Sequence, residues 1–160
     1  MILPIVPYGD AVLRAETQPV AEPTSTEMQQ LVADMYETMY HANGVGLAAP
    51  QIGRAVRLFI VDGQKMEPPE DWPEEDMAGF KQVFFNPEML EETGTKRGFE
   101  EGCLSIPGIR EVVKRAPSIA LRYQDAEGNP HTETFTGLRA RIIQHEYDHL
   151  EGVLFTDYAT

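Results

Sequence analysis

Two histidines four residues apart, with a glutamate directly after the first, are the residues best suited to chemistry in this sequence. They lie in the segment His145-Glu146-Tyr147-Asp148-His149. On a helix, positions i and i+4 share one face, so both imidazoles can reach a single divalent metal ion. Glu146 is then rotated by about 100° and can address a water beside that ion. The pattern predicts hydrolysis by an activated water, against the alternative of two surface histidines without a role.

A catalytic ion of this kind needs a third protein ligand and one open position. The residues that follow do not supply that ligand. A metzincin protease would carry a third histidine where this chain has Phe155, and Glu151 is the last glutamate, so no thermolysin-like ligand follows either. The third ligand is therefore expected upstream of His145.

Cys103 is the only cysteine, and a single thiol cannot form an intrachain disulfide. A lone cysteine is often a small buried hydrophobic residue, and that interpretation stays open. Its neighbours favour another interpretation, because Gly102 permits a close backbone approach and Pro107-Gly108 marks a turn. With His145 and His149, Cys103 would form a Cys-His-His site with one open position.

A third segment, residues 43–53, reads NGVGLAAPQIG. A helix end with a left-handed cap would explain Asn43 and Gly44. Small residues continue at Gly46, Ala48 and Ala49, which would let another chain lie against this backbone. Gln51 then offers a neutral side-chain donor of the oxyanion-hole kind.

Together, GVGLAAPQIG at 44–53, EGCLSIPG at 101–108 and QHEYDHLEG at 144–152 resemble the three motifs of the peptide deformylase family. The similarity extends to residues 8–14 near the start and 152–155 near the end, and so spans nearly the whole chain. The resemblance implies a bacterial enzyme that removes the formyl group from the N-terminal methionine of nascent polypeptides and releases formate.

The resemblance also implies a role for each residue. Cys103, His145 and His149 would bind the metal ion, and Glu146 would act as general acid and base. Gln51 and the amide of Leu104 would stabilise the tetrahedral oxyanion. The expected substrate-binding residues are Gly44, Val45, Gly46, Glu101, Gly102, Leu138, Arg141 and Ile142.

The residues do not by themselves name the metal, because a thiolate with two imidazoles suits both ferrous iron and zinc. The resemblance implies Fe²⁺ in the cell. The purified protein is expected to accept Zn²⁺, Ni²⁺ or Co²⁺ as well.

Arg141 lies four residues before His145 and hence on the same helix face, where some relatives have an apolar residue in the methionine pocket. We expect its stem to line the pocket while the charged end reaches water or an acid. On this basis, Arg141→Leu should change side-chain preference more than turnover.

The remaining sequence predicts an α+β fold. The 160 residues, 42% of them hydrophobic, suffice for one domain over residues 1–160. A first helix is expected with Thr24 or a nearby residue as N-cap, Glu27 completing a capping box, and an apolar stripe of core residues at Met28, Leu31, Val32, Met35 and Met39. The last helix should begin near Gly137-Leu138, carry the metal ligands and lie centrally against antiparallel sheets.

Strands are predicted over 55–61, 82–90, 110–114, 118–124 and 131–135. Residues 62–79, rich in acids and prolines, are predicted to form a surface loop. No boundary or internal repeat divides the chain.

Composition limits the partners. A net charge of -13 with only four lysines argues against nucleic-acid binding. The acid excess indicates solubility, with adaptation to high salt as the alternative. No apolar run approaches membrane-spanning length, and the start lacks a basic leader, so a cytoplasmic monomer is expected. The sequence ends eleven residues after His149, without the basic C-terminal helix of many relatives, so we expect at most a transient ribosome contact.

Two rival functions remain at this point. One is a general metallopeptidase, and the other is a non-catalytic binding protein whose metal stabilises the fold. Glu146 favours an enzyme, because a structural zinc site usually has four protein ligands and needs no base.

Overall fold

The computed structural model describes residues 1–66 and 77–158. Three short 3-10 helices accompany two α-helices and seven strands in this part of the chain. In chain order they are η1 (Ala11–Arg14), α1 (Thr26–His41), β1 (Gly46–Ala48), η2 (Ala49–Ile52), β2 (Leu58–Asp62), β3 (Lys81–Thr93), β4 (Arg97–Cys103), β5 (Ile106–Arg115), β6 (Ser118–Gln124), β7 (Pro130–Thr136), α2 (Gly137–Leu150) and η3 (Phe155–Tyr158).

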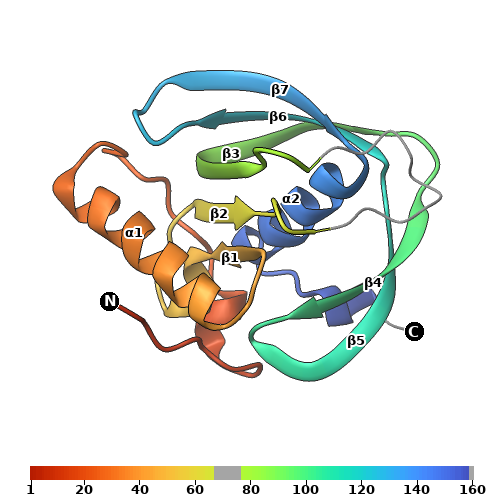
Figure 1. Ribbon diagram of the computed structural model, residues 1–160, viewed down its shortest axis with the longest axis horizontal. Coiled ribbons are helices and arrows are strands. Elements are labelled where there is room, and N and C mark those ends of the chain that lie inside the picture. Colours follow the sequence, from red (N-terminus) through yellow and green to blue (C-terminus); the bar gives the residue numbers. More distant parts are fainter. Residues whose placement is uncertain (67–76, 159–160) are drawn as a thin grey trace.

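The strands form two antiparallel sheets. The larger has the order β1-β2-β3-β6-β7, and β4 pairs with β5 in a separate hairpin. Helix α2 contacts β1, β2, β6 and β7, and Figure 1 shows it enclosed between the large sheet and the hairpin. The predicted α+β fold, with antiparallel sheets around a central helix in a single domain, is confirmed.

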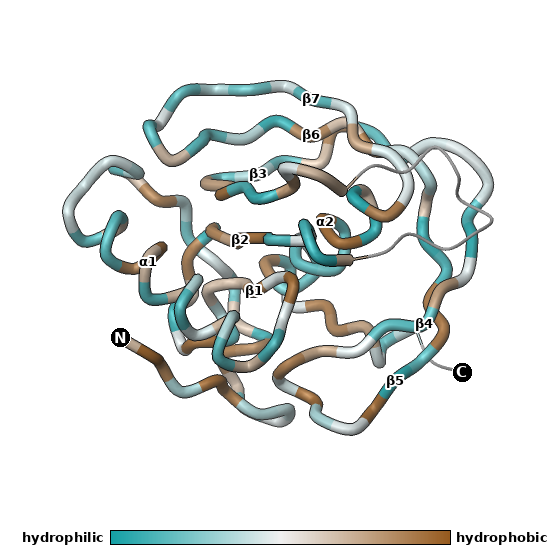
Figure 2. The backbone as a smooth tube through the Cα atoms, in the orientation of Figure 1, coloured by the Kyte–Doolittle hydropathy of each residue, from teal (hydrophilic) through white to brown (hydrophobic). Residues whose placement is uncertain are grey.

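Strand β2 is buried on both faces, which explains its nearly continuous apolar sequence. Phe59 and Val61 belong to the hydrophobic cluster that includes α2, whereas Leu58 and Ile60 belong to the cluster that includes α1. In Figure 2, β2 is brown along most of its length, while β7 at the sheet edge is mostly teal. The two helices therefore cover opposite faces of the sheet.

Helix α2 is anchored at its C-terminal end. The carbonyl of Leu150 accepts hydrogen bonds from Thr17 Oγ1 at 2.7 Å and from an Arg57 nitrogen at 3.5 Å. A cation at this position also interacts favourably with the helix dipole. The helix that carries both metal histidines is thereby fixed to the sheet and the N-terminal segment.

The helix predictions are largely confirmed. Helix α2 begins at Gly137 as expected, and the apolar stripe of α1 is in the core, with Val32 partly buried. The N-cap was predicted at Thr24 or a nearby residue and is Ser25, whereas the predicted capping box with Glu27 is wrong. Ser25, not Thr24, is extended and accepts the amide of Met28 at 3.2 Å, so Glu27 lies in the first turn without forming a capping box.

All five predicted strands exist, with ends displaced by several residues in β2, β3 and β5. Two strands were missed. β1 contains only Gly46–Ala48, and β4 is rich in glycine and glutamate with Phe99 as its one aromatic residue, so neither is enriched in the β-branched and aromatic residues typical of strands. The predicted loop over 62–79 lies largely outside the described residues.

Candidate metal centre and active site

Cys103, His145 and His149 come together as predicted. One ligand atom from each residue lies within 4.8 Å of the others. Cys103 Sγ is 3.3 Å from His149 Nε2, and the two imidazole ring centres are 5.3 Å apart. A thiolate and two imidazoles at this separation match the ligand set of a catalytic Zn²⁺ or Fe²⁺ site.

The hairpin directs the cysteine toward the helix. Strands β4 and β5 pair regularly up to Gly102 and Arg110, and the register then shifts so that Cys103 faces Ile106. Such irregularities re-aim the side chains beside them. A Cβ on Gly102 would lie 3.0 Å from the Arg110 guanidinium, so glycine suits this closely packed turn.

The ring of His145 is oriented by Glu101. Burial by itself would raise the pKa of Glu101, but hydrogen bonds from His145 and Arg115 outweigh it and lower the pKa to about 2. The ionised carboxylate can only accept, so His145 Nδ1 donates to it at 2.8 Å. Burial would lower the pKa of His145, but hydrogen bonds with Cys103 and Glu101 outweigh it and raise the pKa to about 10. A metal ion would take the place of the proton on Nε2, while Glu101 still holds Nδ1.

His149 is 2% exposed, and burial lowers its pKa well below the ordinary value. The neutral imidazole is the form that binds metal. The geometry, the two imidazole nitrogens and the adjacent sulfur therefore fit one divalent ion.

Glu146 lies beside the ligands and is buried. Its Oε1 has no hydrogen-bond partner among the described residues, and a Cβ on Gly46 would lie only 2.5 Å from its Oε2. Burial raises the pKa of Glu146 to about 7, against the attraction of His145. A carboxyl group with a pKa near the working pH can both take and return a proton.

Gln51 is held in a defined orientation. Its Oε1 accepts the amide of Ala48 at 2.9 Å, which directs the NH₂ group toward Cys103 Sγ and Ser105 Oγ, each 3.3 Å away. The side chain is 1% exposed. A neutral donor is thus fixed beside the metal ligands, as expected from the sequence.

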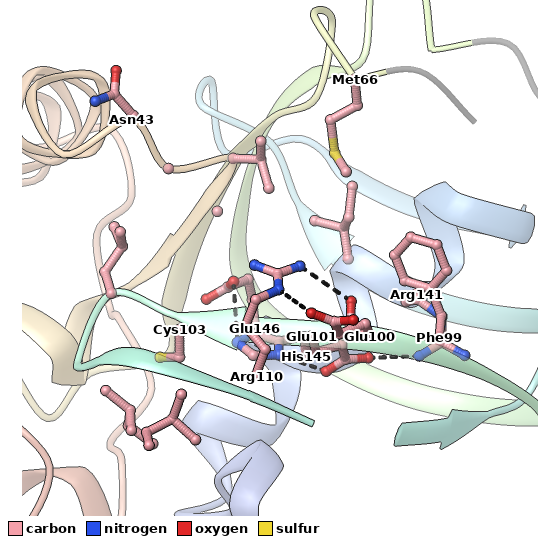
Figure 3. Close-up of a pocket in the computed structure, with 18 of the residues that line it drawn as sticks. Asn43, Met66, Phe99, Glu100, Glu101, Cys103, Arg110, Arg141, His145 and Glu146 are labelled. Carbon is pink, nitrogen blue, oxygen red and sulfur yellow. Dashed lines mark hydrogen bonds and ion pairs between the residues drawn. The ribbon is translucent and has the colours of Figure 1, made fainter. Parts of the chain in front are cut away.

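A cavity of about 470 Å³ opens above the ligands, and Figure 3 shows its lining. All eight residues predicted to bind substrate line it, together with Gln51, Cys103, Leu104, His145 and Glu146. Sequence reasoning missed further lining residues: Asn43, Met66, Phe99, Glu100, Ile106, Gly108, Ile109 and Arg110. Glu100, Ile109 and Arg110 would have followed from recognising β4 and its pairing with β5.

Arg141 has the predicted arrangement. The residue lines the cavity, and its charged end reaches an acid, Glu101, at 2.7 Å. Glu101 also lines the cavity, but its carboxylate oxygens accept from Arg115, Arg141 and His145. The carboxylate is therefore engaged within the protein rather than directed at a substrate.

These features fit a class of protein: the metal-dependent hydrolases, with three side chains placed to hold one ion, a buried carboxyl group beside them, and a cavity large enough for a peptide end. The family model for polypeptide deformylase matches residues 2–160, and the chain belongs to that family. It is therefore an enzyme that removes the N-formyl group from nascent polypeptides.

Individual relatives are similar in sequence over nearly the full length of this chain. The chain is 52% identical to the peptide deformylase of Flavobacterium psychrophilum, covering 100% of this chain and 84% of that protein. The protein of Salinibacter ruber is 49% identical over 99% of this chain and 80% of its own.

Solved structures are similar as well. A Met-Ala-Ser-bound class I type b peptide deformylase from Acinetobacter baumannii has a TM-score of 0.88 at 36% identity, covering 99% of this chain and 98% of that one. The enzyme from Thermotoga maritima has a TM-score of 0.87 at 36% identity, covering 100% of this chain and 99% of that one.

Within the described residues, no helix is long and apolar enough to cross a bilayer.

Proposed function

We propose that deformylation takes place at the inner end of the cavity, with Cys103, His145 and His149 as the metal ligands and Glu146 as the acid and base. The observation that carries this proposal is the meeting of one sulfur and two imidazoles within 4.8 Å, beside a buried carboxylate. Three protein ligands leave a coordination position open to solvent and substrate, which is the arrangement of catalytic sites.

A divalent cation in this position supplies Lewis acidity, which makes water acidic enough to be a nucleophile near neutral pH. Glu146 takes the proton that the water releases when it attacks the formyl carbon. The same carboxyl group then returns the proton to the departing amine, so that formate and a free N-terminus are released. Its pKa near 7, caused by burial, suits both steps.

The tetrahedral oxyanion requires donors fixed before the reaction. Gln51 Nε2 is one, because Ala48 fixes the orientation of its amide. The backbone N–H of Leu104, directly after the metal ligand Cys103, is the second. Both residues line the cavity next to Cys103, which supports their joint role.

The formylmethionyl end is proposed to enter this same cavity. Leu138, Ile142 and the stem of Arg141 offer apolar surface to the methionine side chain, and the backbone can lie between 44–46 and 101–102. The Met-Ala-Ser peptide bound to the similar enzyme of Acinetobacter baumannii supports a peptide of this length.

Fe²⁺ is proposed as the ion used in the cell, with Zn²⁺, Ni²⁺ or Co²⁺ able to replace it. A thiolate ligand beside two imidazoles suits each of these ions. Anaerobic purification followed by metal analysis and activity assays on iron- and zinc-loaded protein tests the assignment. Equal turnover with both metals would remove the preference for iron.

We further propose a cytoplasmic monomer that meets its substrates as they leave the ribosome, with at most a transient contact. A deficit of positive charge gives little attraction to ribosomal RNA, which supports a short-lived encounter. Light scattering tests the monomer, and co-sedimentation with ribosomes at low and physiological salt tests the contact.

The experiment that tests the function compares formyl-Met-Ala-Ser with its acetylated and unmodified forms. The formylated peptide should release formate, whereas the acetylated peptide should keep its acetyl group, because the added methyl group crowds the reacting carbon. Glu146→Ala should retain the metal ion and lose about 100- to 10,000-fold in turnover, the usual contribution of a general acid and base. Cleavage of internal peptide bonds would favour the metallopeptidase, and an inert, fully metal-loaded protein would favour a structural metal.

A further inference from the structure

The metal ligands come from two parts of the fold that share no sheet. His145 and His149 belong to α2, whereas Cys103 ends β4 in the two-stranded sheet. Among the described strands, neither β4 nor β5 pairs with the large sheet. Side chains must therefore hold the hairpin against the helix at the distance that a metal ion requires.

A buried group of charges lies at this junction. Its members are Glu101, Arg115, Arg141 and Asp148. Arg115, at the end of β5, donates two hydrogen bonds of 2.6 and 2.9 Å to Glu101 and one of 2.8 Å to Asp148 on α2. Glu101 and both arginines are each no more than 7% exposed, so solvent screens these ion pairs little.

Arg141 connects the helix to both strands of the hairpin. From α2 it donates to Glu101 on β4 at 2.7 Å and to the carbonyl of Val113 on β5 at 2.9 Å. It also donates to the carbonyl of Arg97 on β4. The planar guanidinium can make these bonds at once because its donors point in several fixed directions.

The same carboxylate orients a metal ligand. Glu101 accepts from Arg141 through Oε2 and from His145 through Oε1, and Figure 3 shows the carboxylate between the two side chains. Arg141 is thus connected to the imidazole of His145 through one residue, Glu101. Along the chain, Glu101 lies two positions before Cys103.

We propose that Arg141 is a positioning residue for the metal site. It fixes Glu101, and through it the ring of His145, while its bonds to one backbone carbonyl on each strand hold the β4–β5 hairpin, and with it Cys103, at coordination distance from α2. This inference rests on the proposed metal site and assigns Arg141 a role in keeping the ion bound, beyond lining the methionine pocket.

Loss of the Arg141 side chain should therefore weaken metal binding, in addition to any change in the side-chain preference of the pocket. Substitutions of residues that orient metal ligands commonly reduce metal affinity about 10- to 100-fold. From the sequence we expected Arg141→Leu to alter side-chain preference more than turnover. From the structure we expect the main effect of Arg141→Leu and of Arg141→Met to be weaker metal binding.

The test uses full-length protein loaded with Co²⁺, whose thiolate charge-transfer absorption reports the bond to Cys103. A chelator in excess is added, and the decay of that absorption gives the rate of metal release. Arg141→Met should release Co²⁺ at least 10-fold faster than the unchanged protein. Arg141→Lys, which keeps the charge but cannot reach all three acceptors, should fall between them.

Two control variants separate positioning from general stability. Arg122→Gln removes an arginine of the exposed pair with Glu88, and Leu31→Ala weakens the core beside α1. Circular dichroism selects folded samples, and Arg141→Lys serves if Arg141→Met does not fold. Both controls should release Co²⁺ at the rate of the unchanged protein.

Release from the Arg141 variants at the unchanged rate, or an equal acceleration in Leu31→Ala, would overturn the positioning role. Absence of the thiolate absorption from the unchanged protein would instead contradict the proposed metal site itself. The two failures are therefore distinguishable in one experiment.

Discussion

At the scale of single residues, the contact between Glu146 and Gly46 determines where the acid and base can be. The carboxylate packs against the backbone of β1 so closely that a Cβ on Gly46 would lie 2.5 Å from Oε2 and 2.9 Å from the carboxyl carbon. No real Cβ contact is this short, so any side chain at position 46 must displace Glu146. The glycine of the GVGLAAPQIG segment thus makes room for the carboxyl group that we propose as acid and base.

Gly46→Ala should therefore reduce turnover while the metal ion stays bound. A displacement of about 1 Å in a catalytic group can cost about 100-fold in rate. Steady-state release of formate, together with metal content, measures the effect. Gly98→Ala is the matched control, because its Cβ would meet only the exposed Val112 side chain, at 3.0 Å. Equal rates for Gly46→Ala and Gly98→Ala would show that Glu146 has room to move.

The site residues differ in how far sequence could predict them. His145 and His149 follow from helical periodicity alone, and Cys103 follows because it is the only remaining soft ligand. The role of Glu101 could not be predicted, because it depends on Arg115 and Arg141 approaching from other elements. Side chains that act through tertiary contacts leave no spacing pattern in the sequence.

At the scale of elements, the start of α1 shows how two adjacent residues compete for one cap. The side chains of Thr24 and Ser25 can each accept a hydrogen bond from a backbone N–H. Glu27 lies three residues after Thr24, the spacing of a capping box. The structure uses Ser25, which accepts the amide of Met28. This choice rotates no core residue, so Met28, Leu31, Met35 and Met39 remain buried.

Ser25→Ala should destabilise the protein by about 1 kcal/mol, the usual cost of losing an N-cap side chain. Thr24→Ala should leave the free energy of unfolding nearly unchanged, because its neighbour is the cap. Urea unfolding followed by circular dichroism measures both variants. A larger loss in Thr24→Ala than in Ser25→Ala would restore the cap expected from sequence.

Sequence patterns predicted a strand well where one or both of its faces are buried. The stretch over 118–124 coincides with β6, and the apolar run before residue 62 became β2 because both of its faces are covered. β1 and β4 were missed because pairing, and not side-chain pattern, makes them strands. Gly46–Ala48 is a strand through its register with 59–61, which no local propensity reveals.

At the scale of the whole molecule, several tyrosines join distant elements and resist ionisation, four of them most strongly. Burial, together with hydrogen bonding to Asp62 and Asp148 respectively, raises the pKa of Tyr40 and of Tyr158 to about 12. The pKa values of Tyr36 and Tyr123 are also raised, with burial as the largest cause. In the unfolded chain each would ionise at a pKa of about 10.

The fold should therefore lose stability at alkaline pH. A tyrosine with a raised pKa contributes its full stabilisation below the unfolded pKa of about 10 and loses it as the pH rises through the folded value. The urea midpoint should stay constant from pH 8 to 9.5 and fall steadily by pH 11.

Tyr123→Phe provides the control, because it removes one of the four groups and the hydrogen bond to Glu133. Its urea midpoint should fall less steeply with pH than that of the unchanged protein. A midpoint that does not change between pH 8 and 11 would contradict the role of these phenol groups.

The whole architecture brings one sulfur from the hairpin to two nitrogens of the central helix, and X-ray absorption at the metal edge tests that meeting most directly. Zinc-loaded protein should show one sulfur at about 2.3 Å and two imidazole nitrogens at about 2.0–2.1 Å, with one further light atom from solvent. A fully loaded sample whose metal has no sulfur neighbour would contradict joint binding by Cys103, His145 and His149.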